Sequence, residues 1–270
     1  MDHSDAGLTA ISRQFVNLGE RQAVCPSHGA FTATGRVLGG REVWTTCQDC
    51  HKEQLRAEID DRARRQAEIN AKEREAAIGQ ACIPARFRSL TFESFVPETP
   101  AQLETLTRVR DYAEGFAEHK GRGTGLVLAG KPGTGKTHLA AAAMLTLLDA
   151  GVWVQYTACM GLIRMVRETW GKDSERTERS VIRLLGEQID LLVIDEVGVQ
   201  YGTESEQHIL FEVLDRRYAE MRPTILITNQ DKVNFKALIG ERISDRLTQT
   251  HDWIAFNWAS YRREARGASQ

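Results

Sequence analysis

The fold of this chain is decided by one octapeptide, Gly130-Lys131-Pro132-Gly133-Thr134-Gly135-Lys136-Thr137. It matches the phosphate-loop pattern G-x-x-x-x-G-K-[ST] at every position. Apolar residues at 126–129 precede it and an alanine-rich run at 138–145 follows it, so the sequence predicts the strand, loop and helix that this pattern requires. Glycines allow successive backbone N–H groups to face a phosphate at the positive end of a helix. A glycine-rich turn without a ligand is the alternative, which the complete match in this context disfavours.

The octapeptide and His138, which follows it, form the predicted ATP-binding segment. We expect Lys136 to reach the β- and γ-phosphates of ATP and the Thr137 hydroxyl to bind Mg²⁺. Aromatic and apolar residues upstream, between 83 and 95, form either one wall of an adenine pocket or packing alone.

A second apolar run, at 191–194, ends in two carboxylates, Asp195 and Glu196. On a parallel strand these residues lie at the carboxyl edge of the sheet, where nucleotides bind. We expect Asp195 to hold Mg²⁺ through water and Glu196 to act as general base on the attacking water. Asn229 follows the next apolar run and either orients that water, senses the γ-phosphate or begins a turn. Alternation of such strands with helical runs predicts an α/β fold, a parallel sheet flanked by helices.

Two pairs of metal-ligand residues lie near the N-terminus, Cys25 with His28 and Cys47 with Cys50. Each pair is separated by two residues, and the strand-like residues between the pairs predict a hairpin that brings them together. We expect these four side chains to bind Zn²⁺ in a closed, structural site, with His51 as an alternative fourth ligand. Unconnected thiols and imidazoles are the other interpretation.

The composition is that of a folded protein, with 41% hydrophobic and 27% charged residues and a net charge of −2. A global charge for binding polyanions is absent, so any contact with nucleic acid must be local. The sequence shows neither a signal peptide nor an apolar run of about 20 residues, so we expect a cytoplasmic protein without membrane contact. Five cysteines in a reducing compartment favour metal binding or free thiols over disulfides.

We expect three segments: a zinc-binding domain at 1–51, a helical linker at 52–80 and an ATPase domain at 81–270. A short apolar pattern within 1–24 predicts a small helix at the start of the first segment. The linker is rich in Ala, Glu, Arg and Lys and predicts a mostly solvated helix. Residues 101–119 have helical spacing and predict one helix at the start of the ATPase domain.

Arg242 and Arg246 lie four residues apart and share one face of a predicted helix. They belong either to a surface charge network or to an arginine finger that acts on a neighbouring subunit. Four motifs together resemble the DnaC-type bacterial replicative helicase loaders, which are AAA+ ATPases: GKPGTGKTHL at 130–139, LLVIDEVGV at 191–199, GERISDRL at 240–247 and FNWASYR at 256–262.

The resemblance implies an ATPase that self-assembles through ATP sites between subunits. It also implies a loader that binds the DnaB-type helicase hexamer and delivers it onto single-stranded DNA. Carried over by motif, Asn229 is the first sensor, Arg246 is the arginine finger with Arg242 beside it, and Arg262 is the second sensor.

The first segment departs from the metal-free N-terminal domain of the best-known loader. It is similar to the C-x2-H-G…W-x2-C-x2-C start of some phage or prophage loader relatives, with Trp44 in place. In this family the N-terminal domain grips the helicase, so the resemblance implies that 1–51 does so here. A zinc domain with another use is the alternative.

Two other functions share part of this pattern. An IstB-like transposition helper, which binds duplex DNA and a transposase, has the same core motifs but is disfavoured by the C-terminal motifs and the zinc-like start. A nucleotide kinase is disfavoured because no lid for a second substrate is recognisable.

Contact with single-stranded DNA is expected within 157–188, where a solvated helix face is the alternative. The basic and aromatic candidates there are Arg164, Arg167, Trp170, Lys172, Arg176, Arg179 and Arg183.

Overall fold

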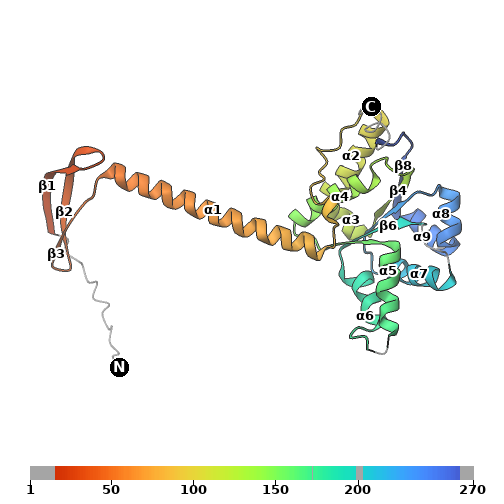
Figure 1. The fold of residues 1–270 in the computed structure, drawn as a ribbon. Coiled ribbons are helices and arrows are strands. Elements are labelled where there is room, and N and C mark those ends of the chain that lie inside the picture. Colours follow the sequence, from red (N-terminus) through yellow and green to blue (C-terminus); the bar gives the residue numbers. More distant parts are fainter. Residues whose placement is uncertain (1–15, 172, 199–202, 262–270) are drawn as a thin grey trace, which may run out of the picture. The chain divides into compact units, whose positions relative to one another are not determined.

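The computed structural model describes residues 16–171, 173–198 and 203–261 (Figure 1). The chain divides into two compact units, an N-terminal unit (1–71) and a C-terminal unit (72–270). The predicted second sensor, Arg262, and the first fifteen residues lie outside the described residues.

The N-terminal unit contains a three-stranded antiparallel sheet in the order β1-β2-β3. Its strands are β1 (Val16–Cys25), β2 (Gly29–Leu38) and β3 (Arg41–Trp44). The small helix predicted before Cys25 is wrong for Val16 onward, because β1 pairs with β2 from Val16 to Cys25. Backbone pairing along a whole strand outweighs a weak apolar spacing.

The sheet of the N-terminal unit has almost no hydrophobic core. Among its described residues, the buried hydrophobic side chains are Cys25, Ala33 and Cys47. Trp44 covers Gly35 so closely that a Cβ there would come within 2.8 Å of the indole ring. The Arg21 guanidinium lies 4.1 Å from the centre of the same ring, on the exposed surface. Hydrophobic burial therefore contributes little to the stability of this sheet.

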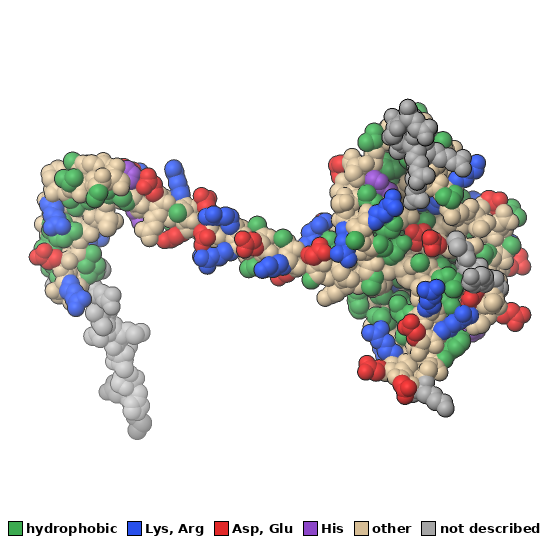
Figure 2. All heavy atoms as spheres, in the orientation of Figure 1, with side chains coloured by type: hydrophobic (Ala, Val, Ile, Leu, Met, Phe, Trp, Pro, Cys, Tyr) green, Lys and Arg blue, Asp and Glu red, His purple; other side chains and the backbone are tan. Residues whose placement is uncertain are grey.

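The helix predicted for the linker is present as α1 (Gln48–Gln80) and begins four residues earlier than predicted. Ile78 is its one buried residue. Figure 2 shows Lys and Arg side chains interspersed with Asp and Glu along the helix, and ion pairs such as Arg65–Asp61 link successive turns. Such pairs support a helix that has no apolar face of its own.

The C-terminal unit is built on a five-stranded parallel sheet in the order β5-β6-β7-β4-β8. The strands are β4 (Gly125–Gly130), β5 (Val154–Ala158), β6 (Leu191–Val197), β7 (Thr224–Thr228) and β8 (His251–Phe256). The helices are α2 (Pro100–Glu114), α3 (Phe116–Arg122), α4 (Lys136–Asp149), α5 (Cys159–Arg167), α6 (Glu178–Arg183), α7 (Glu204–Ala219), α8 (Lys232–Ile239) and α9 (Glu241–Thr250). Short helical turns cover Ala85–Phe87, Glu168–Trp170 and Leu184–Gln188.

Helices cover both faces of this sheet. Successive residues of β6 alternate between the faces, so Leu191 and Val193 join the core beneath α2 and α4. Leu192 and Ile194 join the second core, beneath α5, α7 and α9. The predicted fold class, a parallel sheet flanked by helices, is confirmed. The single helix predicted at 101–119 is instead two helices, because the chain breaks at Gly115 between α2 and α3.

A buried arginine fastens the amino ends of β6 and β7. The side chain of Arg217, on α7, is 1% exposed. Its guanidinium donates to the carbonyls of Leu185, Ile189, Asp190 and Pro223 and to the hydroxyl of Thr224. Burial lowers the pKa of Arg217 to about 9, which still leaves it charged at neutral pH. The edge of the sheet that carries Asp195 is the opposite one.

No helix among the described residues is both long enough and apolar enough to cross a membrane.

Candidate nucleotide-binding site and metal centre

The octapeptide forms the loop between β4 and α4, in the predicted strand, loop and helix. Gly135 has a φ of 95°, and a Cβ at this position would lie 2.6 Å from the Phe95 ring. A Cβ at Gly130 would lie 2.5 Å from the carbonyl oxygen of Phe256. Both positions therefore require glycine, and the chain closes into a loop whose end is the N-terminus of α4.

The predicted phosphate-binding lysine lies inside this loop. Lys136 is 6% exposed, and its Nζ donates to the carbonyls of Gly130 at 2.6 Å and Lys131 at 2.8 Å. Thr134 is fully buried and its hydroxyl donates to the same Lys131 carbonyl. A buried ammonium group beside a helix N-terminus fits the negative charge of a nucleotide phosphate.

Two residues with roles predicted in magnesium binding come together although 58 positions separate them. The Thr137 hydroxyl donates to Oδ2 of Asp195 at 3.0 Å. Asp195 is 7% exposed, and its Oδ1 accepts the Glu196 backbone N–H at 2.7 Å. Tyr156, on β5, donates its hydroxyl to Oδ2 of Asp195 at 3.1 Å. A hydroxyl and a buried carboxylate are oxygen ligands of the kind that Mg²⁺ prefers, so the residues fit this cation.

The Glu196 side chain reaches the same cavity as Asp195 because the strand is irregular there. Adjacent residues of a regular strand point to opposite faces of the sheet. The pairing of β6 with β7 shifts register between Ile194 and Val197, and Glu196 has a φ of 58°. Both carboxylates therefore line one cavity. A non-glycine residue in this conformation is strained, and such strain concentrates at functional sites.

The cavity beside the loop has a volume of about 590 Å³, within the size range of small-molecule sites. Phe87, Leu90 and Phe95 line it, and both Phe92 and Phe95 are also buried in the core. The segment thus packs on the core and lines the cavity, and a wall for adenine stays a prediction. Asn229 also lines the cavity.

The C-terminal segment closes over the outside of the phosphate loop. The indole N–H of Trp258 donates to the Thr134 carbonyl at 3.0 Å, and the backbone N–H of Tyr261 donates to the Gly133 carbonyl at 3.1 Å. His138, the last residue of the predicted ATP-binding segment, turns toward the Thr91 carbonyl, 3.0 Å from its Nε2. Spacing in the sequence gave no signal for these contacts.

The two candidate finger arginines do not line this cavity in their own chain. Both lie on α9 and face α7, where Arg246 forms an ion pair with Asp215. The Arg246 guanidinium also lies 4.9 Å from the Tyr218 ring centre, and its side chain is 23% exposed. Arg242 is 68% exposed and lies 5.2 Å from the Phe211 ring centre.

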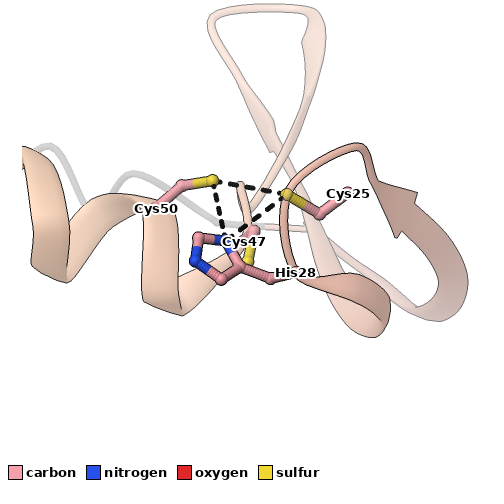
Figure 3. A group of neighbouring side chains, drawn as sticks. All are labelled: Cys25, His28, Cys47 and Cys50. Atoms are coloured by element: carbon pink, nitrogen blue, oxygen red, sulfur yellow. Dashed lines mark hydrogen bonds between the residues drawn. The ribbon is translucent and has the colours of Figure 1, made fainter.

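The four predicted zinc-binding side chains converge in the N-terminal unit (Figure 3). Their ligand atoms all lie within 4.8 Å of one another, and His51 is not part of the group. Cys25 ends β1, His28 lies in the turn before β2, and Cys50 is in the first turn of α1. Three sulfurs and one imidazole nitrogen at such separations fit tetrahedral Zn²⁺.

The chemistry of this cluster suits a cation. A hydrogen bond with Cys50 lowers the pKa of the Cys25 thiol, which favours the thiolate, the form that binds metal. The Nδ1 of His28 faces the sulfurs, 3.3 Å from Sγ of Cys50, while its Nε2 lies 3.0 Å from Oε1 of Glu53. A carboxylate on the far nitrogen is the usual partner of a zinc-binding histidine. Reasoning from the sequence did not identify Glu53.

Two of the candidate residues for DNA contact already have partners within the chain. Arg167 pairs with Glu206, which is 3% exposed. Trp170 is 55% exposed, and its indole N–H donates to Glu178. Lys172 lies outside the described residues.

Comparison with known proteins gives the family. A family model described as IstB-like ATP binding protein matches residues 91–269. The chain belongs to this family. The replicative helicase loader DnaC of Escherichia coli (strain K12) is 35% identical over 181 residues, which cover 67% of this chain and 72% of that protein. The crystal structure of the DnaC helicase loader has the same fold, with a TM-score of 0.57 at 19% identity over 64% of this chain and 99% of that one.

One relative also matches much of the N-terminal part. The uncharacterized protein YdaV of Escherichia coli (strain K12) is 33% identical over 240 residues, which cover 88% of this chain and 90% of that protein. The family model begins only at residue 91. The match to YdaV covers 88% of this chain, which is more than the part from residue 91 onward. It therefore extends into the residues before 91, which include α1 and the metal-ligand cluster.

Proposed function

We propose that the protein is an ATP-hydrolysing loader that binds the hexameric DnaB-type replicative helicase and delivers it onto single-stranded DNA. The observation that carries the proposal is the match, over two thirds of the chain, to proteins named replicative helicase loader. The cavity beside the phosphate loop supports it, because the residues that ATP hydrolysis needs line this cavity together.

Five polar residues that line the cavity have parts in hydrolysis. Mg²⁺, when bound, supplies positive charge that offsets the charge developing on the phosphates. Thr137 and Asp195 hold this cation, and Lys136 contributes a second positive charge at the phosphates. Glu196 accepts a proton from the attacking water, and Asn229, the first sensor, orients that water.

Assembly of several chains completes the site in this proposal. Arg246, with Arg242 beside it, acts in the ATP site of a neighbouring chain, for which it must exchange its ion pair with Asp215 for the nucleotide phosphates. Arg262, the proposed second sensor, directly follows Tyr261, whose backbone N–H is bonded to the phosphate loop. Hydrolysis is thereby tied to self-assembly.

The N-terminal unit is the proposed helicase-binding part, and Zn²⁺ is its structural metal. A closed site of four protein ligands leaves no coordination position for catalysis.

The loader acts in the cytoplasm. Single-stranded DNA is contacted by the segment 157–188, with exposed Trp170 as a stacking surface for a base.

A second candidate function is an IstB-like transposition helper, which binds duplex DNA and a transposase. The description of the matching family model favours it. Both functions need the same ATP site, so partner choice separates them.

A co-migration experiment tests the proposal. The full chain is mixed with the replicative helicase of its own host, with and without ATP, and mass and stoichiometry are read across a sizing column. We expect a stable complex that is lost with the quadruple variant that removes the metal ligands. Absence of a complex, together with ATP-dependent filaments on duplex DNA, would favour the transposition helper.

A further inference from the structure

Tyr156 contacts the carboxylate that the proposed function assigns to magnesium. Its hydroxyl lies 3.1 Å from Oδ2 of Asp195, the same oxygen that accepts the Thr137 hydroxyl at 3.0 Å. We propose that Tyr156 is a positioning residue of the magnesium site, whose hydroxyl fixes Asp195 beside Thr137 and so strengthens Mg²⁺-dependent nucleotide binding. The proposal rests on the ATP site of the proposed function.

The register of the sheet explains how Tyr156 reaches this carboxylate. In the parallel pairing of β5 with β6, Tyr156 lies opposite Val193 and Ala158 lies opposite Asp195. Residues two apart on a strand share a face, so Tyr156 and Asp195 are diagonal neighbours on one face of the sheet. A long aromatic side chain spans this diagonal distance, whereas an aliphatic one would not bring a donor to Asp195.

The hydroxyl of Tyr156 completes the set of donors around Asp195. Oδ1 accepts the backbone N–H of Glu196, and Oδ2 accepts the two hydroxyls of Tyr156 and Thr137. A carboxylate bonded on both oxygens has one orientation, which a carboxylate bonded on a single side does not. Each hydroxyl has one proton and two lone pairs, so Thr137 can donate to Asp195 while it offers a lone pair to a cation.

The phenol acts as a donor across the physiological range. A tyrosine hydroxyl has an ordinary pKa of about 10, so it carries its proton at neutral pH. The neutral phenol therefore adds no charge to the site. Its donated hydrogen bond holds the orientation of the Asp195 carboxylate beside Thr137.

Tyr156 is itself held in place at two points. Its backbone N–H donates to the Ala81 carbonyl at 2.8 Å, which covers this part of the outer edge of β5. Its ring meets the Phe87 ring edge-on, with centres 6.3 Å apart and planes at 67°. Replacement of Tyr156 by Phe keeps both contacts and removes only the hydroxyl, so the fold is retained.

The test compares nucleotide binding with and without the cation. Affinity of the full chain for a non-hydrolysable ATP analogue is measured by calorimetry in Mg²⁺ and in EDTA, and the ratio of the two dissociation constants is the readout. We expect Tyr156→Phe to reduce the Mg²⁺-dependent gain about tenfold and to leave the EDTA value unchanged, since a hydrogen bond to a charged group is at stake. The matched control is Tyr112→Phe, which removes a buried hydroxyl bonded to the Thr124 carbonyl.

The control should keep the wild-type ratio. An unchanged ratio in Tyr156→Phe, beside normal wild-type binding, overturns this proposal alone. An equal loss in Mg²⁺ and in EDTA also overturns it, because Tyr156 would then act as a wall for the nucleotide. A wild-type chain that binds no nucleotide overturns both this proposal and the ATP site.

Discussion

Loss of one metal ligand should unfold the N-terminal sheet and leave the C-terminal unit intact. The perturbation is Cys47→Ser, which replaces a buried member of the metal cluster. The matched control is Cys82→Ser, because Cys82 is an exposed thiol outside the cluster.

The expected magnitude follows from how little else holds this sheet. Apart from the two cluster cysteines, Ala33 is the one buried hydrophobic side chain among the described residues of the N-terminal unit. Burial of an entire leucine contributes only ~1.5–3 kcal/mol, and Ala33 contributes less. A structural Zn²⁺ in a small domain contributes ~10–16 kcal/mol, as much as the whole stability of an ordinary domain. A loss of ~10 kcal/mol lowers the folding equilibrium constant about 10⁷-fold, so the sheet should be unfolded.

Hydrogen exchange on the full chain measures this outcome directly. Peptides from Gly29–Leu38 should lose amide protection in Cys47→Ser and in wild-type protein treated with a zinc chelator. Peptides from Leu191–Val197 should keep theirs in both samples. Metal analysis should give about one zinc per chain for the wild type and Cys82→Ser, and none for Cys47→Ser.

Protected amides in Gly29–Leu38 after complete removal of zinc would refute this reasoning. The sheet would then be stable through its backbone pairing alone, and the metal would have no structural role.

Three further outcomes are expected. Lys136→Ala should abolish nucleotide binding in calorimetry, since it removes the ammonium group from the loop; normal binding would mean that phosphate lies elsewhere. Glu53→Gln should weaken zinc affinity about 10-fold in a chelator competition without changing the zinc content of saturated protein, and an unaltered affinity would show that Glu53 does not orient His28. Arg246→Ala should leave nucleotide affinity intact and lower assembly-dependent hydrolysis about 10³-fold in a phosphate-release assay; wild-type turnover would place the finger at another residue.

Much of the C-terminal fold could be predicted because its signals are local. The octapeptide, its flanking strand and helix, and the apolar run before Asp195 each occupy one short stretch of sequence. Long buried strands of a parallel sheet are uniformly apolar, which makes them easy to find. The metal cluster could be predicted for the same reason, because Cys25 and His28, and likewise Cys47 and Cys50, lie within four residues of each other in the sequence.

Contacts that depend on register between distant segments could not be predicted from the sequence. Tyr156 meets Asp195 only because β5 pairs with β6 in one register. The irregularity that turns Glu196 into the cavity has no residue signature, since a glycine would have been expected at a φ of 58°. The segment of β1 was predicted as a helix because its few apolar residues have mixed spacing. Such spacing does not distinguish the period of a helix, about 3.6 residues, from that of a strand, two residues.

The buried guanidinium of Arg217 fixes the first residues of two strands, β6 and β7, relative to each other. The positions of Asp195, on β6, and of Thr228, on β7, are therefore set by the count of residues from that fixed end, and the Thr228 hydroxyl donates to the Val197 carbonyl of β6 at 2.7 Å. Asp195 and Thr228 each lie four residues beyond the first residue of their strand, a span of about 13 Å. A deletion or insertion in either strand would shift the end of that strand by about 3.3 Å relative to the other and break the bond between Thr228 and Val197. We therefore expect insertions and deletions to be tolerated in the connecting loops and not within these two strands.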